Sequence, residues 1–375
     1  MKEGWKYSTL GECCDINYGT RVVRKNVSGD KYPVYGGGGE TFRMDDYNRE
    51  DCLIVSRFAM SKLCTRLVKG KFFLNDSGLS LSPKDGSGLT KDLLERFILA
   101  SNDTIYSYGR GSAQRNLNIK EFSKMPVSYP ASLSDQERIV SYLDSAFAKI
   151  DQLKSNAEKQ MEEAKALFAS ALQSEMEPKE GWEEKTLKEI GQTQTGSTPS
   201  KAVKENYGDY IPFIRPAELN IDGNGGIEYN SEVKLSKEGL SRSRLIKENS
   251  ILMCCIGSVG KTGYSLMDVT CNQQINTLTP IESYDAKYVY YALTSSQFQS
   301  EVKKIADGAK ATLPIINKGK WEQLIIFAPS LPEQQRIVAH LDELSAKTRQ
   351  LEENYKTICA ECDAMKQAIL RETFE

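Results

Sequence analysis

The stretch CIGSVGKTG, which begins at Cys255, contains residue types that bind phosphate in nucleotide-dependent enzymes. A P-loop reads G-x-x-x-x-G-K-[ST], because its first glycine opens a loop of backbone N–H groups around the phosphates. Gly260, Lys261 and Thr262 match the end of that pattern, but its first position is occupied by Cys255. The GYSLMDVT that follows is typical of a strand, so no helix N-terminus would face a phosphate. The pattern therefore favours a hairpin whose Ser258 and Lys261 contact the phosphate backbone of a nucleic acid.

Other residue types offer little for catalysis or metal binding. Nine cysteines are an odd number, which argues against a disulfide framework. Cys359 and Cys362 form one CxxC motif without a second pair, and the single histidine, His340, lies 19 residues upstream. That histidine lies in a helical pattern away from any candidate nucleophile, and no N/D-P-P-Y/F motif of an adenine methyltransferase occurs. We therefore expect no metal, no cofactor and no catalytic site in this chain.

Several polar loops could bind a nucleic acid instead. GRGSAQRNLN, which begins at Gly109, combines two arginines, small residues and amide side chains. Arginine and amide groups recognise guanine and adenine edges in the major groove, and small residues suit phosphates. Similar loops at matching places in two halves of the chain predict a binding face. These loops are TQTGSTPSK at Thr193, CNQQIN at Cys271 and DGAKATLPIIN at Asp307.

The chain consists of two copies of one unit. SLSDQERIV at Ser132 recurs as SLPEQQRIV at Ser330, 198 positions later. KEGWKYSTL near the N-terminus recurs as KEGWEEKTL, 177 positions later. Internal repeats of this kind indicate repeated structural units, here 1–177 and 178–375.

The second part of each copy is predicted to be one long coiled-coil helix. Apolar side chains recur there in alternating steps of four and three without an interrupting glycine or proline. Ser134 and Glu137 have the spacing of a capping box, and Pro332 suits a first turn. The two helices are expected to pair with each other, and polar Gln160 and Thr348 to fix the register. The predicted core positions are Ile139, Leu143, Ala146, Ile150, Leu153, Ala157, Gln160, Ala164, Leu167 and Ala171, and the equivalents Ile337, Leu341, Leu344, Thr348, Leu351, Tyr355, Ile358, Cys362, Met365 and Ile369.

The first part of each copy predicts an α+β domain with short strands. Apolar or alternating runs such as LIVSRFAM and SILMCCIG are separated by glycine-rich turns such as DGNGGIEY. YGGGGE marks either a turn or a close approach of the backbone to a ligand. Single helices are predicted at TKDLLERFILAS and AKYVYYALTSSQFQSEV. The predicted domains are thus 1–131 and 178–329, followed by the helices 132–177 and 330–375.

Charge is distributed unevenly between these parts. The net charge is −2 and the isoelectric point is about 5.9. Residues 1–131 contain 20 Lys/Arg against 15 Asp/Glu, whereas the helical parts 132–180 and 330–375 contain 12 against 19. The globular parts can therefore present basic faces to nucleic acid. No apolar run reaches the ~18 residues of a membrane span, and the N-terminus lacks the apolar core of a signal peptide, which predicts a cytoplasmic protein.

The duplicated line S-L-x-x-Q-x-R-I-V-x-x-L-D, followed each time by a heptad helix, closely resembles the specificity (HsdS) subunit of type I restriction–modification systems. Trp5 with Leu10, and Trp182 with Leu187, also look like the openings of that family's target-recognition domains. The resemblance implies two such domains with twisted short-stranded sheets, separated by two antiparallel coiled-coil helices in a pseudo-twofold repeat. Each domain would read one half of a split, asymmetric site in double-stranded DNA.

The resemblance also implies partners. Two modification subunits would dock on the helices and methylate adenine with S-adenosylmethionine, and motor–nuclease subunits would join the larger complex. The chain itself would not be catalytic. The first domain departs from the family's GSxGK pattern, with RFAMSK at 57–62. DNA-contacting residues would be Arg57, Lys62, Arg110, Ser112, Gln114, Arg115 and Asn116 in the first domain, and Thr195, Ser197, Thr198, Lys201, Ser258, Lys261, Gln273, Gln274, Lys310 and Thr312 in the second.

Helix length yields a rough expectation for the DNA site. The 33 residues from 139 to 171 span ~50 Å, which corresponds to ~15 base pairs and leaves a spacer of roughly 5–9 pairs after each domain's footprint. Two other classes stay open. One is the specificity chain of a combined restriction–modification enzyme that cuts on both sides of its site, and the other is a non-enzymatic coiled-coil scaffold.

Overall fold

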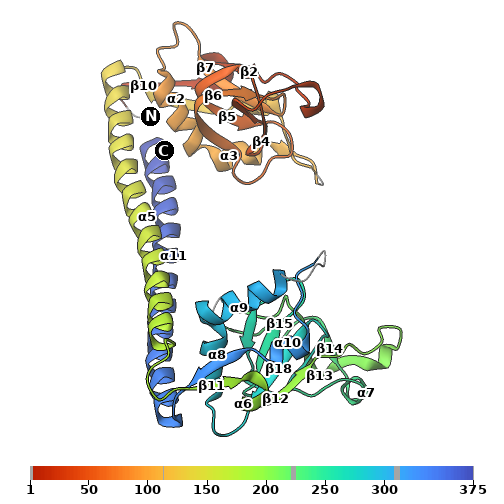
Figure 1. Ribbon diagram of the computed structural model, residues 1–375. Helices are drawn as coiled ribbons and strands as arrows, with labels where there is room; N and C mark the ends of the chain where they lie inside the picture. The colour runs from red at the N-terminus through yellow and green to blue at the C-terminus, as the bar shows by residue number, and fades with distance from the viewer. Residues whose placement is uncertain (1–2, 113, 221–224, 308–312, 375) are drawn as a thin grey trace. The chain divides into compact units, whose positions relative to one another are not determined.

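The computed structural model contains two compact units, and each combines a globular part with one half of each long helix (Figure 1). Unit 1 comprises Met1–Glu158 and Lys356–Glu375, and unit 2 comprises Lys159–Tyr355. The prediction of an α+β fold with two long paired helices is confirmed. The residues that the structure describes are 3–112, 114–220, 225–307 and 313–374.

A six-stranded sheet forms the centre of unit 1. The elements of its globular part are β1 (Trp5–Thr9), α1 (Leu10–Cys13), β2 (Cys14–Tyr18), η1 (Arg24–Asn26), β3 (Tyr32–Tyr35), β4 (Glu40–Met44), β5 (Arg49–Ser56), β6 (Thr65–Leu74), β7 (Gly78–Pro83), α2 (Lys91–Ala100), α3 (Asn102–Ser107), β8 (Gly109–Arg110), β9 (Asn116–Leu117), α4 (Ile119–Ser123) and β10 (Pro126–Pro130). The sheet has the order β2-β7-β5-β6-β3-β4, in which β3 and β6 are parallel and the other neighbours antiparallel. Because strand side chains alternate, β5 buries Leu53 and Val55 in one core with α2 and buries Cys52 and Ile54 in a second core.

Unit 2 distributes its strands over three sheets, of which the smallest is the antiparallel pair of β11 and β19. The elements of its globular part are β11 (Glu183–Thr186), α6 (Leu187–Ile190), β12 (Gly191–Thr195), η2 (Lys204–Asn206), β13 (Tyr207–Ile214), β14 (Lys234–Leu235), α7 (Lys237–Ser241), β15 (Ile251–Cys254), β16 (Thr262–Tyr264), β17 (Thr270–Cys271), β18 (Ile275–Pro280), α8 (Ala286–Thr294), α9 (Ser296–Asp307), α10 (Lys318–Glu322) and β19 (Ile325–Ala328). The two larger sheets have the orders β12-β18-β15-β16 and β14-β13-β17. Like β5, β15 alternates between two cores: Ile251 and Met253 pack with α8, and Leu252 and Cys254 pack on the other side. The two copies thus build their central strands on the same principle.

The prediction of one helix over AKYVYYALTSSQFQSEV is wrong. Ser295 adopts an extended conformation with ψ 147° between α8 and α9. Its hydroxyl accepts a hydrogen bond from the backbone N–H of Phe298 at 3.3 Å, so it caps the second helix. Serine competes for backbone hydrogen bonds in this way at helix starts, which explains the break.

The duplicated line begins the two long helices, α5 (Leu133–Glu175) and α11 (Leu331–Phe374). The expected capping box of Ser134 and Glu137 is not where α5 starts. The hydroxyl of Ser132 instead accepts from the backbone N–H of Asp135 at 3.4 Å, two residues earlier than predicted. Pro332 lies in the first turn of α11, as expected.

The two helices are antiparallel, because later residues of α5 contact earlier residues of α11. In unit 1, Lys154 forms an ion pair with Asp363 at 2.7 Å. In unit 2, Arg336 forms an ion pair with Glu175 at 2.8 Å. The pairing expected from the heptads is therefore present in each unit.

The buried seam, meaning the row of residues packed between the two helices, differs from the predicted core positions. Every second predicted position is replaced by the residue that follows it. Both registers keep the four-three spacing of a coiled coil, so spacing alone does not choose between them. Phe147 and Phe168 decide the choice, because they also pack against the globular cores of units 1 and 2, respectively. Gln160 is exposed, so the prediction that it fixes the register is wrong. The predicted positions Leu153, Gln160, Leu167, Leu351, Ile358 and Met365 are exposed, and Lys154, Met161, Phe168, Glu352, Cys359 and Lys366 are half-buried in their place.

Candidate nucleic-acid interface

In unit 1, the loop that follows β5 lies against the β8–β9 hairpin. The backbone N–H of Leu117 donates to the carbonyl of Arg57 at 2.8 Å, and the N–H of Met60 donates to the carbonyl of Arg115 at 2.8 Å. Two segments more than fifty residues apart in the sequence therefore form one surface. The predicted residues in 57–62, 110–112 and 114–116 are brought together on it.

Unit 2 repeats this arrangement with different residues. The N–H of Ile316 donates to the carbonyl of Cys255 at 2.9 Å, and the N–H of Gly257 donates to Pro314 at 3.0 Å. The segment from Cys255 to Lys261 forms the connection between β15 and β16, which confirms the predicted hairpin. The GSVGK hairpin of unit 2 thus occupies the place of RFAMSK in unit 1. Lys310 and Thr312, which were predicted to belong to this face, lie outside the described residues.

A third loop joins the face in unit 2. After β12, the N–H of Gly196 donates to Ile275 and the N–H of Ser197 to Cys271, both at 2.9 Å. The hydroxyl of Thr198 donates to Oε1 of Gln273. The predicted loops 195–201 and 271–274 are therefore neighbours.

Unit 1 contains a counterpart of this third loop that the sequence reasoning missed. The N–H of Gly19 donates to Gly78 at 3.1 Å, and the N–H of Thr20 donates to Leu74 at 2.9 Å, as in unit 2. Applying the offset of 177 between the KEGW copies to the predicted loop of unit 2 would have identified it. That offset relates Thr198 to position 21 and Lys201 to position 24. The loop adds the exposed cations Arg21, Arg24 and Lys25 to the candidate interface.

Two of the predicted cations are used inside their own unit. Nε of Arg115 donates to the carbonyl of Tyr106 at 3.1 Å, and its guanidinium lies 4.5 Å from the centre of the Tyr106 ring. Nζ of Lys261 donates to the carbonyl of Pro216 at 2.8 Å. These contacts stabilise the two loops, so both side chains have a structural role.

The other predicted residues differ in exposure. Asn116 accepts from the N–H of Ala59 at 3.2 Å, and Thr195 donates to Asn276 at 2.8 Å. Gln274 is likewise half-buried and accepts from Asn272 at 2.9 Å. Arg57 and Ser197 are half-buried as well. The exposed members of the set are Lys62, Arg110, Ser112, Gln114, Thr198, Lys201, Ser258 and Gln273.

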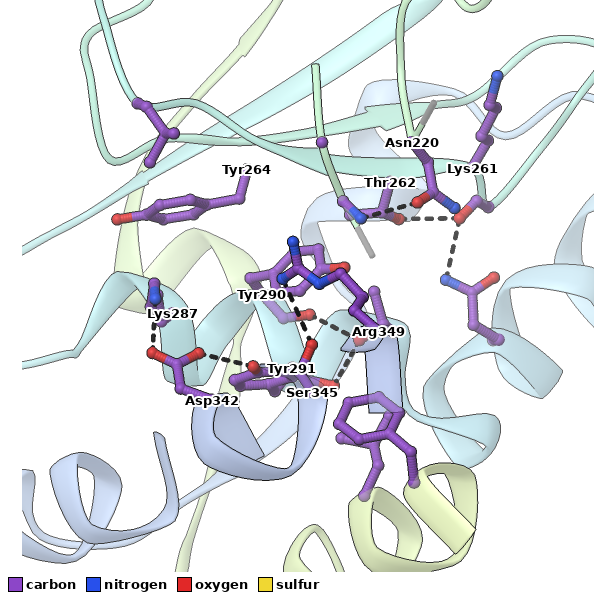
Figure 2. A pocket seen from close by; sticks show the side chains of 18 residues that line it. Asn220, Lys261, Thr262, Tyr264, Lys287, Tyr290, Tyr291, Asp342, Ser345 and Arg349 are labelled. Carbon is purple, nitrogen blue, oxygen red and sulfur yellow. Dashed lines mark hydrogen bonds and ion pairs between the residues drawn. The ribbon is translucent and has the colours of Figure 1, made fainter. Parts of the chain in front are cut away.

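A cavity of about 470 Å³ lies behind the hairpin of unit 2, between β16, α8 and the α5 and α11 segments of that unit (Figure 2). Tyr264, Tyr290 and Phe168 are among its lining residues. Asp342 accepts hydrogen bonds from the Tyr291 hydroxyl at 2.7 Å and from the Lys287 ammonium at 2.5 Å. These bonds tie α8 to α11, so they hold the globular part of unit 2 on its helices.

Burial raises the pKa of the Cys255 thiol to about 12, which disfavours the reactive thiolate form of this side chain. Within the described ranges, no cluster of three or more His, Cys, Asp and Glu side chains is placed to hold a metal ion. Among the helices that the structure describes, none has the length and apolar character needed to cross a membrane.

Comparison with known proteins identifies the class. The family model for the type I restriction modification DNA specificity domain matches residues 2–163 and 179–358. The chain therefore belongs to this family and contains two copies of its domain.

Individual relatives agree with this family. The specificity subunit of the type I restriction enzyme HindI from Haemophilus influenzae is 32% identical over 152 residues, which is 40% of this chain and 32% of that protein. The EcoR124I/EcoR124II specificity subunit from Escherichia coli is 29% identical over 241 residues, 61% of this chain and 57% of that protein. The matched segments thus span about a third to three-fifths of the length of these relatives.

Solved structures share the fold. A chain from a study of complex assembly and conformational transition of the type I R-M system superposes with a TM-score of 0.76 at 18% identity, covering 100% of this chain and 98% of that one. The HsdS subunit from Thermoanaerobacter tengcongensis superposes with a TM-score of 0.56 at 18% identity, covering 100% and 97%. At this identity the likeness concerns the fold alone.

Proposed function

We propose that this chain is the specificity subunit of a type I restriction–modification complex and reads a bipartite, asymmetric sequence in double-stranded DNA. The observation that carries the proposal is the pair of loop clusters, one in each unit, built with the same backbone hydrogen bonds but with different side chains. Because the backbone hydrogen bonds are the same, the two clusters have the same position within their units. Because their side chains differ, the two clusters read different half-sites. The chain selects the site in the cytoplasm and leaves adenine methylation, with S-adenosylmethionine, to its partners.

Phosphate and base contacts fall on different residues in this proposal. Exposed cations such as Arg24, Lys25 and Lys201 supply the sequence-independent attraction to phosphate. Polar side chains at the hairpins and neighbouring loops, such as Gln114 and Gln273, face base edges in the major groove. The negative charge of the helices is compatible with this function, because those helices bind protein partners.

The exposed apolar side chains of α5 and α11 support docking of two modification subunits. Leu153 and Met365 in unit 1 are 56% and 52% exposed, and Leu167 and Leu351 in unit 2 are 65% and 40% exposed. Each directly precedes a seam position, and in an antiparallel pair such positions from both helices flank the same side of the seam. Each unit therefore exposes one apolar strip, which is the kind of surface that receives an amphipathic helix. Two strips fit two modification subunits, and motor–nuclease subunits complete the complex.

Charge insertion into one strip should remove one partner. We expect Leu167→Glu with Leu351→Glu to leave a complex with one modification subunit, because a desolvated carboxylate in an apolar interface is costly. Leu153→Glu with Met365→Glu should remove the other subunit. Light scattering of co-expressed complexes measures the stoichiometry, with Gln350→Glu on the outer face of α11 as the matched control. Two bound subunits in every variant would contradict this docking surface.

Genome-wide methylation tests the proposed function directly. Single-molecule sequencing of the host genome should show a methyladenine motif with two specified halves separated by unspecified bases. Exchanging residues 178–329 for the equivalent domain of a relative should change one half of the motif and leave the other unchanged. A methylome without a bipartite motif, together with no duplex binding by the purified complex, would favour a protein-binding scaffold. Cleavage on both sides of the site would instead identify the combined restriction–modification class.

A further inference from the structure

The side chain of Arg57, at the start of the unit 1 loop, lies over two aromatic rings. Its guanidinium carbon is 4.9 Å from the centre of the Tyr18 ring and 4.4 Å from the centre of the Phe58 ring. Both rings are partly solvent-exposed, at 49% and 37%. Stacking of this kind restricts a planar guanidinium to one orientation while its donors stay at the surface.

The backbone on both sides of Arg57 is also held. Its N–H donates to the carbonyl of Ser77 at 2.8 Å, and its carbonyl accepts from Leu117 at 2.8 Å. The preceding Ser56 is buried and donates to the carbonyl of Gly37, in the glycine-rich loop. Arg57 therefore projects from a point where three segments of unit 1 meet, at Gly37, Ser77 and Leu117.

One edge of the guanidinium is used and the other is free. Nη1 donates to the carbonyl of Asp76 at 3.3 Å. Nε and Nη2 have no hydrogen-bond or carboxylate partner among the residues that the structure describes. An arginine presents its donors as a fork, and the Nε–Nη2 edge matches two acceptors in one plane. Guanine offers such a pair, N7 and O6, in the major groove.

The neighbouring arginines, Arg115 and Arg110, do not combine contact with aromatic rings and an unpaired Nε–Nη2 edge. Arg115 uses its Nε and Nη2 for the carbonyls of Tyr106 and Ser107, so its fork is occupied. Arg110 is exposed and lies over no aromatic ring of the described residues. In unit 2, the hydrogen bond from Ile316 places Cys255 where Arg57 lies in unit 1. The feature is thus specific to the first globular part.

We propose that Arg57, held by contact with the rings of Tyr18 and Phe58, recognises a guanine through its Nε–Nη2 edge and so specifies one G·C pair in the half-site read by unit 1. This inference rests on the proposed function. It assigns one guanine to Arg57 in the half-site read by unit 1, and it makes Tyr18 and Phe58 positioning residues. Preorganisation strengthens the discrimination, because little side-chain entropy is lost on binding.

Base-by-base competition binding tests the assignment in the assembled complex. The DNA is the host's methylated motif, with each pair of both half-sites changed in turn. The wild-type complex should lose about 10- to 100-fold in affinity when the assigned G·C pair is changed. Arg57→Lys keeps the charge but not the planar fork, so discrimination at that pair should disappear while every other position keeps its preference.

Three further variants separate the possible causes. Tyr18→Leu and Phe58→Leu keep Arg57 but free its guanidinium, so each should reduce discrimination at the same pair and nowhere else. Arg24→Gln is the matched control: an exposed arginine without flanking rings should weaken binding to all sequences equally and lower the salt dependence by about one counterion. Unchanged preferences in the second half-site show that each variant is folded.

The outcomes keep the two proposals apart. Failure of the wild-type complex to bind any bipartite site overturns the proposed function. A bipartite site whose first half contains no discriminating G·C pair, or an Arg57→Lys complex with unchanged discrimination, overturns the assignment of Arg57 alone.

Discussion

Gln136 and Gln334, the glutamines of the duplicated line, have no exposed surface to offer a ligand, at 0% and 1% exposure. Oε1 of Gln136 accepts from the N–H of Thr90 at 2.8 Å, and its Nε2 donates to the carbonyls of Gly88 and Pro130 at 2.7 and 2.8 Å. Gln334 accepts from the N–H of Asp285 and donates to a carbonyl in the same way, at 2.9 Å each. The S-L-x-x-Q motif recurs because the buried amide of its glutamine attaches each long helix to its globular part.

Loss of this amide should destabilise unit 1. Gln136→Ala leaves one N–H and two carbonyls without their partner, and we expect the free energy of unfolding to fall by about 2–3 kcal/mol. Urea unfolding measures the effect as a lower midpoint with an unchanged slope. Gln160→Ala, at an exposed position of the same helix, should change stability by less than about 0.5 kcal/mol. Equal midpoints for the two variants would refute the attachment role.

At the scale of elements, Glu175 joins the end of α5 to the start of α11. Its side chain is only 13% exposed and binds Nη2 of Arg336 at 2.8 Å and Nδ1 of His340 at 2.7 Å. The hydrogen bond from Arg336 lowers the pKa of this carboxyl below its ordinary value of 4.5. A carboxyl whose pKa is lower in the folded state stabilises the fold above its unfolded pKa, and this contribution is lost as the pH falls through the folded pKa.

Glu175→Gln should therefore destabilise unit 2 in a pH-dependent way. At pH 7 we expect a loss of about 1 kcal/mol, because a partly buried charge-assisted pair is replaced by a neutral one. The difference from wild type should shrink as the pH falls below 4.5 and through the lowered pKa at which the wild-type carboxyl becomes protonated. Urea titrations from pH 3 to 7 measure this, with the exposed carboxyl of Glu158→Gln as the control. A difference that does not vary with pH would show that packing, not charge, is responsible.

At the scale of the whole molecule, both long helices continue from one unit into the other, so we propose that their length sets the spacing between half-sites. Removing 154–160 from α5 and 352–358 from α11 deletes one heptad from each, which shortens both by ~10 Å, keeps the seam in register and retains Leu153 and Leu351. The unspecified spacer of the methylation motif should shorten by about three base pairs at 3.4 Å each. The methylome of the variant reports the new spacing. An unchanged spacer would exclude the helices as its determinant.

The amino-acid sequence by itself determined the repeat, the α+β class, the long helices and most of the loops that make up the candidate interface. These features depend on local periods and on copies of the same line, which are visible without knowledge of contacts. Only the tertiary structure decided which charged side chains are free. Arg115 and Lys261 are used by the carbonyls of Tyr106 and Pro216, whereas Arg57 is oriented by a ring 39 residues earlier in the chain, in Tyr18.

The heptad register of the long helices was likewise decided by tertiary contacts. Two heptad registers satisfied the spacing equally well, and the globular cores chose between them through Phe147 and Phe168. That choice left Leu153 and Leu351 at the surface, in the strips proposed to dock the modification subunits. The periodicity of a helix is local, but the face that it buries depends on everything that packs against it.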